Sequence, residues 1–139
     1  MTRISEHRVL MDTADLWSKR GTCSRLQVGA VLSRDGRIIA TGYNGNVAGQ
    51  AHCDHRDGSP CETAVHAEEN CLYFAARHGL NTDGSTLYVT HNPCYRCARG
   101  LVNAGVVRVV YRYKYRSAEG IQLLVDSGVA VFPWGEDFL

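Results

Sequence analysis

The chain has 139 residues, of which 45% are hydrophobic and 21% are charged, and its formal net charge is +1. This length suits one domain with a hydrophobic core and is too short for two, so we expect a single domain over residues 1–139. The near-neutral charge lacks the basic excess of a nucleic-acid binder and the acidic excess of a solvating tail, which favours a small-molecule substrate.

No segment carries a signal for secretion or membrane insertion. Charges interrupt the N-terminal segment between Arg3 and Asp15, and no stretch reaches the about 20 apolar residues that span a bilayer. We therefore expect a soluble protein of the cytoplasm, or of the host cytoplasm if a phage encodes it, without a membrane or nucleic-acid partner. Because thiols stay reduced there, the six cysteines are expected to be metal ligands or buried thiols, with a disulfide framework as the alternative.

The first half of the chain predicts a helix, a hairpin and a long loop. Residues 4–19 place apolar side chains at helical spacing without Gly or Pro. Residues 26–32 and 37–43 are rich in β-branched and apolar side chains and flank the turn signal Arg34-Asp35-Gly36, which predicts a β-hairpin. Residues 44–62 carry Asn, Gly, Asp and Pro without a sustained period, and loops of this length are usually functional or held in place.

Strands and helices alternate in the second half. One helix is expected from residue 63 or 64 to about residue 78 and another over residues 94–104, and each precedes a glycine stop signal. The other expected elements are strands at 86–90, 106–111 and 129–132 and a helix at 117–127. This order predicts an α/β fold in which helices cover both faces of a mixed sheet.

Two short motifs combine into a candidate metal site. His66-Ala67-Glu68 lies at the start of one predicted helix, and Pro93-Cys94-Tyr95-Arg96-Cys97 lies at the start of the next. The imidazole of His66 and the thiolates of Cys94 and Cys97 supply three ligands of a tetrahedral zinc site, and a catalytic site keeps the fourth position for water. The positive end of a helix favours the thiolate forms.

Glu68 is predicted to be the proton carrier of this site. It lies two positions after His66 and is not needed as a ligand, so its carboxylate is free to take a proton from water and return it to a departing amine. Zinc lowers the pKa of bound water from about 16 towards 7. A C-x-x-C motif alone also occurs as a redox motif or as half of a structural zinc site, and a lone His also stands at the start of ordinary helices. The combined H-x-E…P-C-x-x-C pattern, however, is the signature of zinc deaminases.

With these residues in place, the chain resembles the deoxycytidylate (dCMP) deaminase family of the zinc-dependent cytidine deaminase superfamily. The run Gly42-Tyr43-Asn44-Gly45 beside a His-type metal motif is the most discriminating feature, because free cytidine deaminases usually have Cys in place of His66. tRNA adenosine deaminases usually lack the Cys-bearing loop. The resemblance covers nearly the whole chain, also through Thr22-Cys23-Ser24-Arg25, Val28-Gly29-Ala30-Val31, His52-Cys53-Asp54, His66-Ala67-Glu68-Glu69-Asn70, Tyr88-Val89-Thr90, Pro93-Cys94 with Cys97, and Asn103-Ala104-Gly105.

The resemblance implies a three-layer cytidine deaminase-like α/β fold, with a mixed five-stranded sheet between helices. It also implies hydrolysis of dCMP to dUMP and ammonia, a reaction that supplies the precursor of dTTP. In that reaction Asn44 would contact the sugar or phosphate, the backbone amide of Ala67 would bind the pyrimidine carbonyl, and Glu68 would protonate N3 and then the leaving amine. Arg25, Gln27 and the loop after Asn44 are candidates for phosphate contacts, although a solvated surface arginine is the alternative for Arg25.

Some members of the family bind a second, structural zinc, and the remaining cysteines suggest the same here. Cys23, Cys53 and Cys61 would be three ligands, and His55 is the preferred fourth, with His52 as the alternative. The chain departs from the phage pattern at Cys61, where a histidine pair is typical, so the fourth ligand stays open. Reduced, buried thiols are the alternative to a second zinc.

Family members commonly assemble as hexamers and respond to dCTP as activator and dTTP as inhibitor, and a nucleotide effector can carry Mg²⁺. The helix after the catalytic glutamate forms subunit contacts in relatives, so Phe74 and Arg77 are candidates for such contacts, with a core aromatic and an exposed cation as the alternatives. Cys71, on the apolar face of this helix, is expected in the core.

Two rival functions remain at this point. The first is a deaminase of another base or nucleotide, such as 5-modified dCMP, guanine or tRNA adenosine, with identical metal chemistry. The second is an inert, zinc-stabilised binding module. The intact Glu68 argues against the second, because a structural zinc needs no unliganded carboxylate at this spacing.

Overall fold

A computed structural model describes residues 1–115 and 117–139, and its five strands form one sheet in the order β2-β1-β3-β4-β5. The strands are β1 (Gly29–Arg34), β2 (Arg37–Tyr43), β3 (Thr86–His91), β4 (Arg108–Tyr113) and β5 (Ala130–Pro133). β1 pairs antiparallel with β2 and β3, whereas β3, β4 and β5 run parallel. The predicted mixed five-stranded sheet is therefore confirmed.

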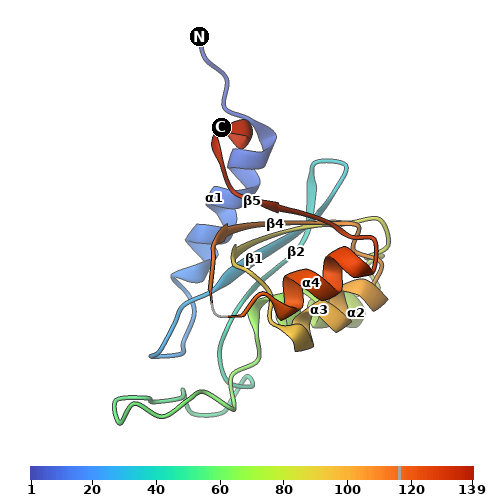
Figure 1. Cartoon of the computed structure of the whole chain (residues 1–139). Coiled ribbons are helices and arrows are strands. Elements are labelled where there is room, and N and C mark those ends of the chain that lie inside the picture. Colours follow the sequence, from blue (N-terminus) through green and yellow to red (C-terminus); the bar gives the residue numbers. More distant parts are fainter. Residues whose placement is uncertain (116) are drawn as a thin grey trace.

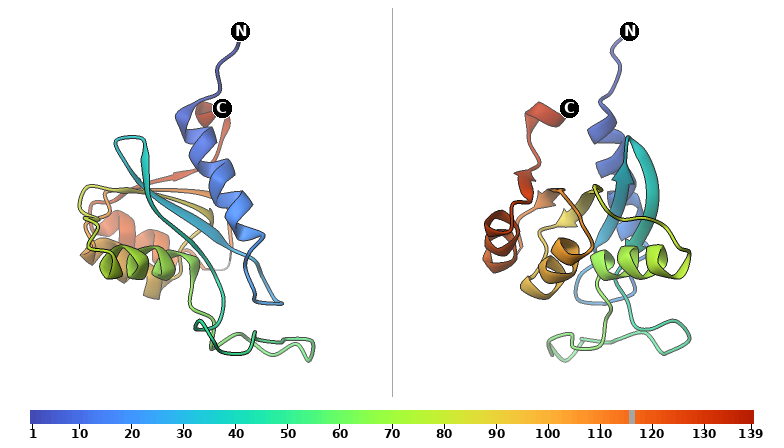
Figure 2. Two further views of the ribbon diagram at one scale, coloured as in Figure 1. Left: turned by 180° about the vertical axis from the view of Figure 1, so that it is seen from behind. Right: turned by 90° about the vertical axis from the view of Figure 1, so that its right-hand side faces the viewer.

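Helices cover both faces of this sheet (Figure 1). The helix α1 (Glu6–Ser18) lies on one face, and α2 (Ala67–Arg77), α3 (Tyr95–Asn103) and α4 (Glu119–Asp126) lie on the other, as the side view in Figure 2 also shows. The helices α3 and α4 connect the parallel strands, which need such crossovers. The three-layer arrangement is confirmed. Within the described part of the chain, no helix has both the length and the apolar character that crossing a membrane requires.

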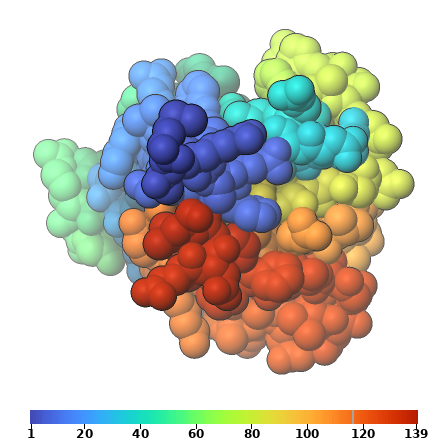
Figure 3. Space-filling view, turned by 90° about the horizontal axis from the view of Figure 1, so that it is seen from above, coloured from blue at the N-terminus to red at the C-terminus, as the bar shows by residue number. Residues whose placement is uncertain are grey.

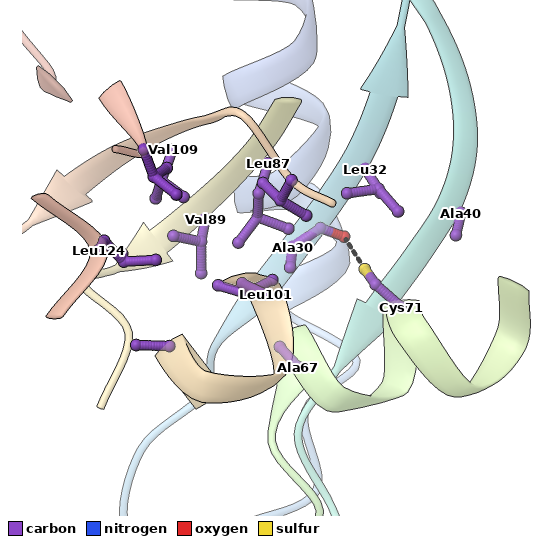
Figure 4. Packing of buried hydrophobic residues seen from close by; sticks show 13 residues of the cluster. Ala30, Leu32, Ala40, Ala67, Cys71, Leu87, Val89, Leu101, Val109 and Leu124 are labelled. Atoms are coloured by element: carbon purple, nitrogen blue, oxygen red, sulfur yellow. Dashed lines mark hydrogen bonds between the residues drawn. The ribbon is translucent and has the colours of Figure 1, made fainter. Parts of the chain in front are cut away.

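Each face of the sheet has its own hydrophobic core. On the α1 face, Met11 is fully buried among side chains of α1 and of the central strands. On the opposite face, Leu101 of α3 and Leu87 of β3 lie at the centre of the larger core (Figure 4). Cys71 is fully buried in this core and its thiol donates to the carbonyl oxygen of Ala30 at 3.5 Å, so its predicted place in the core is confirmed.

The start of α2 contacts strand β2 without an intervening side chain. A Cβ atom at Gly42 would overlap the carbonyl oxygen of Ala67, so only glycine permits this approach. One turn further, the Asn70 side chain donates to the carbonyl oxygen of Tyr43 at 2.8 Å. These contacts fix the segment His66-Ala67-Glu68 against the edge of the sheet.

Two elements begin three or more residues later than the sequence predicts. The helix expected from residue 63 or 64 begins at Ala67, because the Glu69 side chain accepts the backbone N–H of His66 at 3.1 Å and makes His66 the N-cap. The strand expected from residue 26 begins at Gly29, because an Asn44 side chain pairs with the backbone before it. The other predicted elements end within about two residues of their predicted positions.

The C-terminal segment packs on α1, which the sequence analysis did not predict. The 3-10 helix η1 (Glu136–Phe138) follows β5, and the carbonyl oxygen of Phe138 accepts the hydroxyl of Ser5. The Phe138 ring meets the His7 ring edge-on at 5.1 Å and stacks on Trp134 at 5.2 Å. Figure 3 shows the two terminal segments side by side, so both ends of the chain help to cover this face.

Candidate active site

The two predicted metal-binding motifs meet in space. His66 is the N-cap of α2, Cys94 is the N-cap of α3, and Cys97 lies in the first turn of α3. His66 Nδ1 lies 3.2 Å from Cys97 Sγ and 3.5 Å from Cys94 Sγ, and the three ligand atoms lie within 4.8 Å of one another. Ligands bonded to one tetrahedral zinc ion at about 2.0–2.3 Å lie about 3.3–3.8 Å apart, so this donor set fits zinc.

The electrostatics of the trio favour a thiolate before any metal is considered. The hydrogen bond from Cys97, followed by the one from His66, lowers the pKa of Cys94 to about 3. The hydrogen bond between Cys97 and Cys94 is the largest cause that raises the pKa of Cys97, and burial is the next. The bond with Cys94 also raises the pKa of His66. The pair therefore carries negative charge on Cys94, which is the form that binds a cation.

Glu68 lies in the first turn of α2, where only 5% of its surface is exposed. Burial raises the pKa of its carboxyl group from the ordinary value of 4.5 to about 7, although the charge on His66 opposes this shift. Among the described residues it lies outside the group of candidate metal ligands. A carboxyl group with a pKa near neutrality is suited to both taking up and releasing a proton at neutral pH.

A side-chain bridge connects the two helices that carry the candidate ligands. Glu69 of α2 accepts the backbone N–H of His66 and also pairs with Arg96 of α3 at 2.8 Å. Arg96 lies between Cys94 and Cys97, so one carboxylate holds both halves of the trio. The Glu69 side chain is 16% exposed, whereas that of Arg96 is 52% exposed. The sequence analysis missed this bridge, which requires the packing of α2 against α3.

A pocket of about 400 Å³ opens beside the trio, a volume in the range of about 300–1,000 Å³ that is typical of small-molecule sites. His66, Glu68 and Cys94 line it together with Ala67, whose backbone is predicted to bind the base. The other lining residues are Cys23, Arg25, Leu26, Val28, Asn44, Cys61, Ala64, His91, Asn92, Tyr95, Arg96, Tyr115, Ser117 and Glu119. The structure thus brings most of the predicted site residues to one cavity.

The three residues predicted to contact the sugar or the phosphate differ in their placement. Asn44 is 7% exposed and lines the pocket; its Oδ1 accepts the N–H of Val28 at 2.8 Å, and its Nδ2 donates to the carbonyl oxygen of Leu26 at 2.7 Å. Arg25 is exposed and lines the pocket. Within the described part of the chain, Gln27 is not among the lining residues, and its side chain instead donates to the carbonyl oxygens of residues 19 and 21.

The far wall of the pocket contains residues that the sequence analysis missed. His91 and Asn92 lie at the end of β3, directly before the Pro93-Cys94 pair. Their position next to this motif is the one feature of the sequence that could have indicated that they line the pocket. Asn92 accepts the backbone N–H of Tyr115 and donates to the carbonyl oxygen of Ser117 at 3.3 Å. The Asn92 side chain thereby holds the backbone of Tyr115 and Ser117 beside the pocket.

A second group of ligand-type side chains lies beside the same pocket. It consists of Cys23, Cys53, His55 and Cys61, whose ligand atoms lie within 4.8 Å of one another, and we call it the loop cluster. The structure brings His55 to this group, and within the described residues the alternative, His52, lies outside it. All six cysteines are free thiols.

The chemistry of the loop cluster fits a closed structural zinc site. Three sulfurs and one imidazole are a common tetrahedral set. His55 Nε2 is buried and has no hydrogen-bond partner among the described residues, whereas buried polar atoms normally have one. Burial raises the pKa of Cys53 to about 11. Burial also acts to raise the pKa of Cys23, but backbone N–H groups of residues 25 and 26 lower it below its ordinary value.

Comparison with known proteins assigns this architecture to a family. The family model described as the cytidine and deoxycytidylate deaminase zinc-binding region matches residues 4–113. The chain belongs to the cytidine and deoxycytidylate deaminase family. As a member of this zinc-binding deaminase family it is a hydrolase, and the predicted family and fold are both confirmed.

Individual relatives agree with this assignment. ComE operon protein 2 of Bacillus subtilis is 39% identical over 141 residues, which cover 94% of this chain and 72% of that protein. The deoxycytidylate deaminase of Mycobacterium phage D29 is 37% identical over 126 residues, which cover 80% of this chain and 97% of the phage protein. The crystal structure of dCMP deaminase from the cyanophage S-TIM5, in complex with dCMP and dUMP, matches with a TM-score of 0.87 and 39% identity, and the match covers 91% of this chain and 95% of that one.

Proposed function

We propose that the chain hydrolyses dCMP to dUMP and ammonia, with a zinc ion held by His66, Cys94 and Cys97. The observation that carries the proposal is that the three ligand atoms lie together, and that His66, Cys94 and the buried carboxyl group of Glu68 line one pocket of nucleotide size. The cyanophage enzyme, crystallised with dCMP and dUMP, shares this fold over most of both chains, and it supports the choice of substrate.

The reaction replaces the C4–N bond of cytosine by a C4–O bond. When bound, zinc supplies hydroxide at neutral pH, because it lowers the pKa of bound water from about 16 to about 7. Glu68 would take one proton from the attacking water and deliver it to N3 of the ring. It would then move the second proton of that water, from the new C4 hydroxyl, to the departing amine, which leaves as ammonia. Before a metal binds, burial raises the pKa of this carboxyl group to about 7, a value that suits both the uptake and the release of a proton at neutral pH.

The pocket walls would orient the nucleotide. The backbone N–H of Ala67 would donate to the pyrimidine carbonyl, and it lies between His66 and Glu68 in the chain, so the base would be held close to the reacting groups. Asn44 uses one hydrogen of its amide for the carbonyl oxygen of Leu26, which leaves the second hydrogen for the sugar or phosphate. Arg25, exposed at the pocket, would pair with the phosphate.

A substrate panel tests the proposal. The zinc-loaded protein is incubated with dCMP, 5-methyl-dCMP, dCTP, deoxycytidine, guanine and a tRNA containing the target adenosine, and ammonia release is followed. We expect turnover of the monophosphates, and a matched Glu68→Gln protein should release ammonia about 100- to 10,000-fold more slowly while it retains zinc. Turnover of only the nucleoside, guanine or tRNA would overturn the substrate assignment. Zinc binding without turnover of any substrate would support the inert module.

We propose in addition that the loop cluster binds a second zinc ion as a structural site. Its donor set and the unpartnered His55 Nε2 support this. Metal analysis should find about two zinc ions per chain, and about one in Cys53→Ala, because the loss of one of four ligands opens the site. The matched control is Cys71→Ala, a cysteine of the core, which should keep both ions. A single zinc ion in the unmutated protein would refute the second site.

The family resemblance also supports proposals on assembly and regulation. We propose a single-domain protein of the cytoplasm that forms a hexamer, with Phe74 and Arg77 at subunit contacts, and that responds to dCTP and dTTP, with Mg²⁺ accompanying the effector nucleotide. Phe74 is 46% exposed, which leaves its ring available for such a contact. Light scattering of the purified protein and dCMP turnover with each triphosphate, with and without Mg²⁺, test these points.

A further inference from the structure

The loop cluster and the catalytic pocket share a wall. Cys23 and Cys61 are members of the loop cluster and also line the pocket, next to Arg25 and Leu26. A metal ion bound by the cluster would therefore lie against the part of the pocket that is proposed to hold the nucleotide. In Figure 1, the loop of residues 44–62 and the connection before β1 lie at the same end of the molecule.

The connection before β1 depends on side chains for its shape. Residues 22–28, which we call the 22–28 segment, form neither helix nor strand. At one end, the Asn44 side chain binds the backbone of Leu26 and Val28 at 2.7 and 2.8 Å. At the other end, the sulfur of Cys23 accepts the backbone N–H groups of Arg25 and Leu26. Arg25 is thus held between an asparagine anchor and a cysteine anchor.

The cysteine anchor is itself held by a segment that has no regular structure. Cys53, His55 and Cys61 come from the loop of residues 44–62, which contains no helix or strand. The hydroxyl of Ser24 accepts the backbone N–H of His55 at 2.8 Å, and this is a direct bond between the loop and the 22–28 segment. His55 Nε2 is buried without a hydrogen-bond partner among the described residues, so a ligand bound to this atom would complete the junction.

We propose that the loop cluster is a positioning element for nucleotide binding: a metal ion bound there fixes the 22–28 segment and presents Arg25 to the substrate. This inference rests on the proposed function, because it concerns the same pocket. The cluster shares no member with the His66 trio, and Glu68 belongs to neither group. Loss of the second metal should therefore weaken nucleotide binding and leave the chemical step intact.

The test compares two histidines of one loop. His55→Ala removes a cluster ligand, and His52→Ala, an exposed neighbour outside the cluster, is the matched control. Zinc content, the Kd for dUMP by calorimetry, and kcat and KM for dCMP are measured for both. We expect His55→Ala to hold about one zinc ion, with Kd and KM raised about 10-fold or more and kcat changed less than about 2-fold. His52→Ala should match the unmutated protein.

A third variant separates positioning from a general loss of folding. His55→Cys offers a fourth sulfur to the same ion, so it should regain the second zinc and nucleotide binding even where His55→Ala unfolds. An unchanged Kd for dUMP in a His55→Ala protein with one zinc ion would overturn the inference, and so would a loss confined to kcat. Two zinc ions retained in His55→Ala would also overturn it, as would a His55→Cys protein that does not regain the second zinc and nucleotide binding. Failure of the unmutated protein to bind dUMP would instead refute the proposed function.

Discussion

Replacement of Asn44 by alanine should both destabilise the fold and weaken nucleotide binding. The side chain is 7% exposed and makes two hydrogen bonds to backbone, with Val28 N–H at 2.8 Å and the Leu26 carbonyl at 2.7 Å. Each buried backbone group left unpaired costs about 1–3 kcal/mol. Because Leu26 and Val28 are only half-buried, water can reach part of the exposed backbone, and we expect a total loss near the lower end, about 2–4 kcal/mol.

The assay is urea unfolding of the zinc-loaded protein followed by circular dichroism. The matched control is Asn46→Ala. The Asn46 side chain donates to the carbonyl oxygen of Ala51 at 2.8 Å and accepts the hydroxyl of Thr63 at 2.7 Å, and both bonds are exposed to water, so this change should cost less than about 1 kcal/mol. Asn44→Asp gives a sharper comparison: it keeps the acceptor for Val28 but turns a carboxylate oxygen towards the Leu26 carbonyl, so it should not restore stability. Asn44→Ala as stable as Asn46→Ala would refute the reasoning.

Three further changes test other parts of the structure. Glu69→Ala should lower zinc affinity about 10- to 100-fold, because it removes the bridge between the helices that carry the ligands. Zinc affinity is measured by competition with a chelator, and the control Glu136→Ala, at an exposed site, should have no effect. Equal zinc affinities in the two variants would contradict the role of the bridge. Leu101→Ala, at a fully buried site, should lose about 2–5 kcal/mol of stability, and Leu16→Ala, at a site 73% exposed, should stay within about 0.5 kcal/mol in the same unfolding assay. In the metal-free protein, burial holds the pKa of Glu68 near 7 against 4.5, so the folded state binds the proton more tightly and loses stability as pH rises from 4.5 through 7. Glu68→Gln should remove this pH dependence, so the variant should be more stable than the unmutated protein by about 3 kcal/mol at about pH 8 but not at pH 4.5. The same difference in stability at both pH values, measured by unfolding, would contradict this prediction.

The parts of the site that residue type and spacing encode could be predicted from the sequence. His66 and Cys94 each stand at the N-terminus of a predicted helix, and two ligands three positions apart at a helix start face one ion. The same holds for the fold class, because apolar strands that alternate with helices require parallel pairing and crossovers. The loop cluster was anticipated from leftover cysteines in a segment that lacked a packing role.

Other features depend on contacts between segments distant in sequence. The apolar run before Gly29 is typical of a strand, but the Asn44 side chain takes its backbone hydrogen bonds, so β1 starts later. Gln27 lies two positions after Arg25, yet its amide binds carbonyl oxygens at the end of α1, away from the pocket. Tyr115 and Ser117 reach the pocket, and Asn92 bonds the backbone of both, which no local pattern reveals.

The central claim, zinc-assisted hydrolysis with Glu68 as proton carrier, is tested most directly by the reaction of dCMP in ¹⁸O-labelled water, with zinc content measured in the same samples. The unmutated protein should form dUMP that carries the label at C4, with one ammonia released per dUMP. Glu68→Gln should keep its zinc and lose activity by a factor of about 100 to 10,000. Zinc-loaded protein that leaves dCMP unchanged, or a Glu68→Gln variant that converts it at a near-normal rate, would contradict the account.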